Sequence, residues 1–171
     1  MENTYEVRAM KFARILARMF EGCETLEDFE WAIRMYNNAH SRKLNYAHGV
    51  SRVAIIRADY VIKFDMIPQE SFEDGRAGNC NSEEEIYERA CEDGFEYLLA
   101  KTSVHTIEDL TFSIMPRVDH VGEWRRNWYD TCTEEEIEWL ENNVCDLHEG
   151  NIGYRHGKVC VIDYAWDATK Y

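Results

Sequence analysis

The sequence is poor in proline, has no closely spaced cysteine pair and contains no long apolar run. Its six cysteines include no Cys-x-x-Cys pair and no short disulfide framework, so we expect reduced thiols in a cytoplasmic protein. The first residues, MENTYEVRAMKF, lack the apolar segment of a secretory signal. No window holds about 18 uninterrupted apolar residues, so no membrane span is expected.

Positive charge is also scarce, because 33 acidic side chains outnumber 19 lysines and arginines and give a formal net charge of −14. Such a surface repels nucleic-acid phosphates and anionic lipids, so neither a nucleic acid nor a membrane is an expected partner. Two alternatives remain open for the acidity: binding of a basic protein, or mimicry of DNA that blocks one. The 171 residues, 45% of them apolar, can build one compact domain or two small lobes.

The first part of the chain predicts two helices. Residues 5–20 are apolar at helical spacing, at Met10, Phe12, Ile15, Leu16, Met19 and Phe20. The other face is basic, with Arg8, Lys11, Arg14 and Arg18. This helix either packs on the rest of the domain or binds a partner or a membrane surface. Thr25 and Asp28 form the capping pattern of a second helix. This helix has one apolar face at Phe29, Ile33 and Tyr36 and another at Trp31 and Met35, so we expect other parts of the protein to cover it on two sides.

From Asn45 onward the pattern alternates between strands and helices, which predicts an α+β fold. Residues 51–56, 61–66 and 110–115 are typical of strands, and a polar loop covers 69–81 after Pro68. Ser82 is the expected cap of a helix over 83–101, with Glu85 at the capping-box position, and Thr133 caps an acidic helix that ends near Asn143. The stretch IGYRHGKVCVID predicts a hairpin whose turn lies at residues 156–158.

The richest chemistry lies around this hairpin. Asp146 and Asn151 are in the loop before it, and Asp163 ends its second strand. A hairpin would return Asp163 to the neighbourhood of Asn151, which gathers two carboxylates and an amide oxygen at one edge. Clustered oxygen ligands suit Mg²⁺, and a remaining carboxylate can accept a proton from a hydroxyl nucleophile. The alternative for each residue alone is a polar turn with helix-capping side chains.

This stretch, DLHEGNIGYRHGKVCVID, resembles the catalytic loop and metal-binding strand of the protein-kinase-like superfamily. Its D-L-H-x-G-N form is similar to the atypical and small-molecule kinase branches, and short chains of this kind resemble bacteriophage or bacterial kinase-like proteins. The resemblance implies a two-lobed fold with ATP and Mg²⁺ as cofactors. It makes Asp146 the catalytic base, Asn151 and Asp163 the metal ligands, and Asp163-Tyr164-Ala165 the counterpart of the D-F-G motif.

The resemblance also assigns residues that would bind the nucleotide. Lys63, in VIK, matches the strand lysine that holds the α- and β-phosphates. Gly49 is a single glycine where a glycine-rich loop is expected, and the full G-x-G-x-x-G pattern is missing. Glu85 is the favoured partner of Lys63, with Glu84 next and a capping role for Glu85 as the competing interpretation. The segment IMPRVDHVG resembles the hinge, where Met115, Pro116, Arg117 and Val118 would offer backbone groups to adenine; a strand simply ended by proline is the alternative.

Several positions depart from the kinase pattern. The usual H-R-D histidine is absent, with Val144-Cys145-Asp146 in its place, and Ala165 replaces the D-F-G glycine. His148 stands where many protein kinases carry a lysine, and structural packing is its alternative role. The chain ends at Tyr171, so no activation segment is expected. The implied organisation is an N-terminal helical extension at 1–44, an N-lobe at 45–122 and a truncated C-lobe at 123–171.

The leading hypothesis is an ATP- and Mg²⁺-dependent phosphotransferase that acts on the hydroxyl of a protein or a small molecule. The alternative is a catalytically weak or inactive kinase-like scaffold, a pseudokinase, that serves as an acidic protein-binding effector; in a viral setting it would act on a host protein in the host cytoplasm. A third option is another Mg²⁺-dependent transferase, such as an adenylyl-transferring relative.

Overall fold

The computed structural model describes residues 4–66, 79–120 and 128–165, and these form an α+β structure. It divides into two compact units that interleave along the chain. Unit 1 comprises Met1–Cys80 and Ser103–Arg117, and unit 2 comprises Asn81–Thr102 and Val118–Tyr171. The division predicted from the sequence, into an extension at 1–44 and lobes at 45–122 and 123–171, stays a prediction. No described helix is long and apolar enough to cross a membrane.

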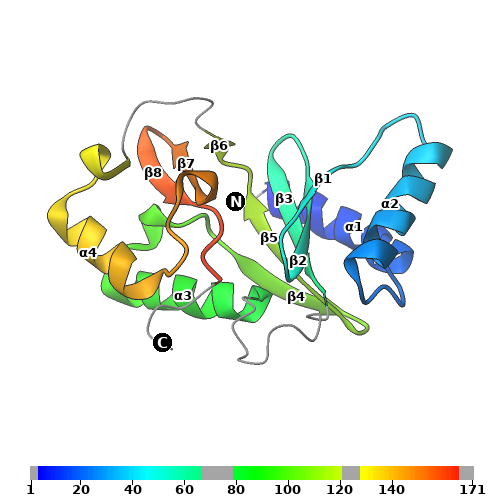
Figure 1. The fold of residues 1–171 in the computed structure, drawn as a ribbon, viewed down its shortest axis with the longest axis horizontal. Helices are drawn as coiled ribbons and strands as arrows, with labels where there is room; N and C mark the ends of the chain where they lie inside the picture. Colours follow the sequence, from blue (N-terminus) through cyan, green and yellow to red (C-terminus); the bar gives the residue numbers. More distant parts are fainter. Residues whose placement is uncertain (1–3, 67–78, 121–127, 166–171) are drawn as a thin grey trace. The chain divides into compact units, whose positions relative to one another are not determined.

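Unit 1 is built on a five-stranded antiparallel sheet in the order β1-β2-β3-β5-β4 (Figure 1). The strands are β1 (Asn45–His48), β2 (Arg52–Ile56), β3 (Tyr60–Asp65), β4 (Ser103–Ile107) and β5 (Leu110–Pro116). The three apolar strands predicted from the sequence are therefore confirmed as β2, β3 and β5. The pattern gave no signal for the edge strands β1 and β4, because an edge strand buries little side-chain surface; none of their residues is fully buried.

The N-terminal helices α1 (Thr4–Met19) and α2 (Leu26–Ala39) share the hydrophobic core of this sheet. Helix α1 contacts β3 and β5. Phe20 joins the two helices to the sheet, with its ring centroid 4.7 Å from that of Phe29 and 5.0 Å from that of Phe64. The interpretation of residues 5–20 as a helix packed on the rest of the domain is therefore confirmed, with Leu16 and Phe20 fully buried.

Two details of these helices differ from the prediction. Ile15 is 56% exposed, because the buried face of α1 is shifted toward the small residues Ala9 and Ala13, which let the helix lie close to the sheet. On α2, Trp31 and Met35 are 61% and 50% exposed, so among the described residues nothing covers the second apolar face. The Thr25–Asp28 capping box is present as predicted.

Unit 2 has a separate core formed by its helices and a small sheet. Its elements are α3 (Cys80–Asp93), whose first residue belongs to unit 1, α4 (Glu134–Asn143), β6 (Asp119–His120), β7 (Ile152–Arg155) and β8 (Lys158–Val161), with short 3-10 helices at Glu96–Leu98, Trp128–Thr131 and Glu149–Asn151. The order β6-β7-β8 forms a three-stranded antiparallel sheet. The Trp139 indole nitrogen on α4 donates to the Asp93 carboxylate on α3 at 2.8 Å, which ties the two helices together.

Helix α3 begins and ends earlier than the sequence predicted. Ser82 is not its cap, because the helix begins at Cys80, whose backbone N–H lies 3.0 Å from the Asp65 carboxylate at the end of β3. The helix stops at Asp93 rather than near residue 101, because Gly94 adopts a φ of +82° that breaks the helical repeat. Helix α4 is confirmed, with a complete capping box between Thr133 and Glu136. Most of the predicted polar loop lies outside the described residues.

Candidate functional site

The predicted hairpin is present, and its register brings Asp163 back toward Asn151. Strands β7 and β8 pair antiparallel, with Ile152 opposite Val161. The turn residues His156 and Gly157 have φ values of +53° and +81°, the combination of a two-residue hairpin loop. Beyond the last pair, the Ile162 N–H donates to the Asn151 carbonyl at 2.8 Å. Asp163 is the residue after Ile162, so the hydrogen bond between Ile162 and Asn151 brings the backbone of Asp163 close to Asn151. The sequence predicted this return of the chain.

Asp146 and Asn151 are joined through the Asn151 side chain. Its amide nitrogen donates to the Asp146 carbonyl at 3.0 Å and to the Asp146 carboxylate at 3.2 Å. Asn151 is 9% exposed, whereas Asp146 is exposed to solvent. Because the amide is planar, these two bonds direct its oxygen away from Asp146, and no described residue donates a hydrogen bond to that oxygen. The arrangement leaves one oriented amide oxygen and one accessible carboxylate in the same loop.

His148 shapes this loop from within. Its Nδ1 accepts the Gly150 N–H at 3.0 Å, and its Nε2 lies 3.6 Å from the Asp146 carboxylate. A Cβ atom added at Gly150 would lie 2.7 Å from the His148 ring, so a larger residue there would displace the imidazole. These contacts favour the structural alternative for His148. They also explain the glycine of the D-L-H-x-G-N stretch by close packing.

The segment that carries Asp163 is anchored on both sides. Leu99 pairs with Val161 in a parallel bridge, and the Ala100 N–H donates to the Val161 carbonyl at 2.8 Å. On the other side, the Tyr164 ring is fully buried and its hydroxyl donates to the Ala100 carbonyl. Burial raises the pKa of Tyr164 well above its ordinary value, so this hydroxyl stays a donor at any physiological pH. Asp163 itself is half-buried.

The donor set fits a hard cation better than a soft one. In the described part of the chain, no three His, Cys, Asp or Glu side chains gather as a metal site. Asp146, Asn151 and Asp163 offer oxygen ligands only, which suits Mg²⁺ that keeps several waters and is bound by one or two carboxylates. The amide oxygen of Asn151, oriented by the two bonds from its own nitrogen, is the observation that supports such a ligand role.

Lys63 lies in the middle of the sheet of unit 1. It belongs to β3, opposite Ala54 on β2 and Ser113 on β5, and is only 7% exposed. A lysine is rarely so buried unless its ammonium group is paired. Lys63 is therefore not an exposed lysine at the edge of the sheet, which was the alternative interpretation.

The other residues predicted to bind the nucleotide differ in burial and in the hydrogen bonds that they already form. The Gly49 N–H donates to the Arg52 carbonyl at 3.0 Å and closes the turn between β1 and β2, so it is not free for a phosphate. In the hinge-like segment Met115 and Val118 are buried, whereas the Arg117 N–H is used by the Asp59 carbonyl at 3.0 Å. On α3, Glu83 has no exposed surface, and Glu85 is exposed. Glu83 lies three residues before Ile86 and seven before Ala90, both buried, so it belongs to the buried face of the helix.

Sequence reasoning missed a second polar site altogether. Unit 1 contains a pocket of about 540 Å³ with basic side chains from α1, the segment before β1, the β2–β3 turn and the end of β5. The only signal in the sequence was the basic face of the first helix, because the other basic residues are scattered along the chain.

Comparisons with known proteins add little to this picture. No protein-family model matches the sequence, and no curated protein matches it. Among solved structures, a chain described as WbdD in co-crystals with a kinase inhibitor matches with a TM-score of 0.44 and 13% identity, over 77% of this chain and 34% of that one. This chain thus spans about a third of the length of the WbdD chain. A likeness at this level carries no argument, so the function has to be argued from the chain's own residues.

Proposed function

We propose that the chain is an ATP- and Mg²⁺-dependent phosphotransferase that transfers the γ-phosphoryl group to a hydroxyl of a protein or a small molecule. The observation that carries the proposal is the bonded pair Asp146–Asn151 immediately before a hairpin that returns Asp163 to Asn151. It is the arrangement that the D-x-x-x-x-N pattern requires, since the base, an amide ligand and a carboxylate ligand have to share one edge.

In this proposal Asp146 accepts the proton of the attacking hydroxyl. The new bond joins that oxygen to the γ-phosphorus, the bond to the bridging oxygen breaks, and ADP leaves. Asn151 and Asp163 would hold Mg²⁺, which would neutralise charge on the phosphates. The exposure of Asp146 allows an acceptor to reach it, and the burial of Asn151 holds the amide still. Both properties support the division of roles.

The proposal assigns Lys63 to the α- and β-phosphates by its place in the sequence pattern. The kinase resemblance also expects a glutamate of α3 to pair with Lys63, and on that helix Glu83 is buried whereas Glu85, the candidate favoured from the sequence, is exposed. Glu83→Gln should therefore reduce nucleotide binding at least roughly tenfold, whereas Glu85→Gln, an identical change on the exposed side of α3, should leave it within twofold. Equal effects of the two variants would remove Glu83 from the site.

The test is the thermal stability of the protein with and without Mg-ATP. A ligand at 100 times its dissociation constant adds about 2.7 kcal/mol of apparent stability, which is readily seen as a rise in Tm. Asp163→Asn should lose most of the rise, and so should removal of Mg²⁺ with EDTA. Asp130→Asn, the same change at an exposed position of unit 2, is the matched control. No rise in the wild-type protein at millimolar Mg-ATP would reject the proposal.

Turnover separates the enzyme from its alternative. With γ-labelled ATP, the wild-type protein should release or transfer label, and Asp146→Asn should lose turnover while it keeps the rise in Tm, because the base is not needed for binding. Transfer of label from α-labelled ATP would instead indicate adenylyl transfer.

The alternative function is an inactive kinase-like scaffold that binds a basic protein through its acidic surface. The turn at Gly49 favours it, because this single glycine, which stands where the kinase pattern has a glycine-rich loop, donates its N–H to the Arg52 carbonyl. This alternative predicts either no rise in Tm with Mg-ATP or a rise without label transfer.

A further inference from the structure

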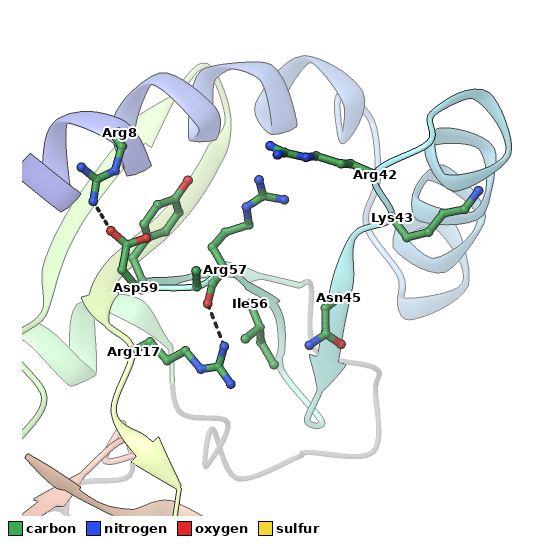
Figure 2. Close-up of a pocket in the computed structure, with 10 residues that line it drawn as sticks. Arg8, Arg42, Lys43, Asn45, Ile56, Arg57, Asp59 and Arg117 are labelled. Carbon is green, nitrogen blue, oxygen red and sulfur yellow. Dashed lines mark hydrogen bonds and ion pairs between the residues drawn. The ribbon is translucent and has the colours of Figure 1, made fainter.

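The pocket of unit 1 concentrates cations in a protein whose formal net charge is −14. Figure 2 shows Arg8, Arg42, Lys43, Arg57 and Arg117 around it, together with a single carboxylate, Asp59. All of these residues belong to unit 1. A volume of about 540 Å³ lies within the range of small-molecule sites. The pocket is therefore large enough for a compact ligand and has the opposite charge from the rest of the protein.

Most of this positive charge lacks a counter-ion among the described residues. Asp59 forms an ion pair with Arg8. Lys43 points away from the pocket in Figure 2 and donates to the Asn37 carbonyl of α2. No described carboxylate pairs with the three arginines that remain, which are Arg42, Arg57 and Arg117. Since like charges repel one another, the approach of the Arg42 and Arg57 guanidinium groups seen in Figure 2 costs free energy that an anion would recover.

Two of these arginines, Arg57 and Arg117, are held in place before any ligand arrives. Arg57 lies over the ring of Phe12, with the guanidinium carbon 4.6 Å from the centroid. Arg117 donates to the Arg57 carbonyl at 3.3 Å, and the Arg57 N–H donates to the Tyr60 carbonyl at 2.9 Å, which closes the turn between β2 and β3. In Figure 2 the guanidinium groups of Arg42 and Arg57 point toward one another. A site with prepositioned donors loses less entropy when it binds.

We propose that this pocket binds a small molecule with two or more phosphate groups. Guanidinium groups match phosphate oxygens with paired N–H donors, and three of them suit a ligand with several phosphates. A compact ligand is favoured over a nucleic acid, because a long polyanion would extend beyond the pocket onto an acidic surface. The site is separate from the proposed catalytic residues: Lys63, Asp146, Asn151 and Asp163 do not line it.

The proposal is tested by calorimetric titration with inorganic tripolyphosphate, without Mg²⁺ and at low salt. Wild-type protein should bind with one site per chain, and the affinity should fall as salt is raised. Arg42→Glu should weaken binding at least roughly tenfold, because it removes a donor and places a carboxylate in the pocket. Arg42 is exposed, and apart from its place in the pocket no described residue interacts with it, so this variant should fold normally; its urea midpoint checks this.

Two controls make the result specific. Arg14→Glu carries the same charge change on an exposed position of α1 outside the pocket, and should weaken binding by less than about threefold. Asp163→Asn should bind tripolyphosphate like the wild type, which keeps this site distinct from the proposed Mg-ATP site. Absence of binding at millimolar tripolyphosphate, or equal losses in Arg14→Glu and Arg42→Glu, would overturn the proposal. Tighter binding of a glutamate-rich peptide than of tripolyphosphate would overturn it in favour of a protein ligand.

Discussion

Replacement of Tyr164 by phenylalanine tests how the segment with Asp163 is held. The change removes one oxygen atom and keeps the ring that fills the core of unit 2. In the structure this hydroxyl is fully buried and donates to the Ala100 carbonyl. Ala100 is itself buried, so its carbonyl would lose its partner without gaining access to water. Tyr164→Phe should therefore destabilise the protein although no cavity larger than one oxygen is made.

The magnitude follows from the cost of an unpaired buried group. Leaving one such acceptor unsatisfied costs about 1–3 kcal/mol, so we expect the free energy of unfolding to fall by about 2 kcal/mol. With a urea m-value of about 2 kcal/mol/M, the unfolding midpoint should fall by about 1 M. Tryptophan fluorescence follows this transition, because Trp128 and Trp139 both lie in the core of unit 2.

Tyr129→Phe is the matched control. It removes the same atom in the same unit, from a hydroxyl that donates to Glu141 at 3.3 Å on the exposed surface. Water can replace that bond, so the midpoint should shift by no more than about 0.25 M. Equal midpoints for Tyr164→Phe and the wild type, or equal losses in the two variants, would refute the assigned anchor. Under the proposed function, Tyr164→Phe should also reduce the Mg-ATP-dependent rise in Tm.

Further predictions concern local structure. The Glu136 pKa is lowered, since hydrogen bonds from the Thr133 backbone N–H and the Tyr97 hydroxyl outweigh the effect of burial. The ionised Glu136 side chain therefore stabilises the folded protein fully at pH values above its ordinary pKa of 4.5. This stabilisation is lost as pH falls through the lowered pKa of the folded state. At pH 7, Glu136→Gln should be less stable than the wild type by about 1 kcal/mol, measured from urea midpoints, and this difference should shrink as pH falls through the lowered folded pKa; the exposed Glu138→Gln should show no such loss. Gly157→Ala should lower the free energy of unfolding by about 1 kcal/mol, because Gly157 has a φ of +81°. Gly49 has the same open space for a Cβ atom but no positive φ, so Gly49→Ala should leave the urea midpoint nearly unchanged.

Much of the local structure was readable from the sequence because its causes are local. The capping boxes at Thr25 and Thr133 involve side chains three residues from the amides they bind, so spacing alone predicts them. The hairpin depends on a turn at His156 and Gly157, and its register follows from the turn. The spacing of Asp146 and Asn151 likewise predicted a shared loop, and the bond between their side chains lies within it.

Other features depend on residues that are distant in the sequence. Helix α3 begins at Cys80 because Asp65 at the end of β3 binds its first N–H. A sequence pattern cannot locate that start, since the carboxylate belongs to another element. The exposed face of α2 at Trp31 and Met35 has the same origin: apolar spacing predicts burial but not whether a neighbour is there to provide it.

The sequence by itself determined the polar groups of the candidate site, because Asp146 and Asn151 share one loop and the following hairpin returns the chain to Asn151 just before Asp163. The existence of the basic pocket, in contrast, depends on the tertiary structure alone. Its arginines, at positions 8, 42, 57 and 117, come from a helix, a loop, a turn and a strand end. Each arginine alone is an ordinary surface residue. Packing of α1 on the sheet places them around one space, and their summed charge, which no stretch of sequence displays, is what makes that space a candidate site.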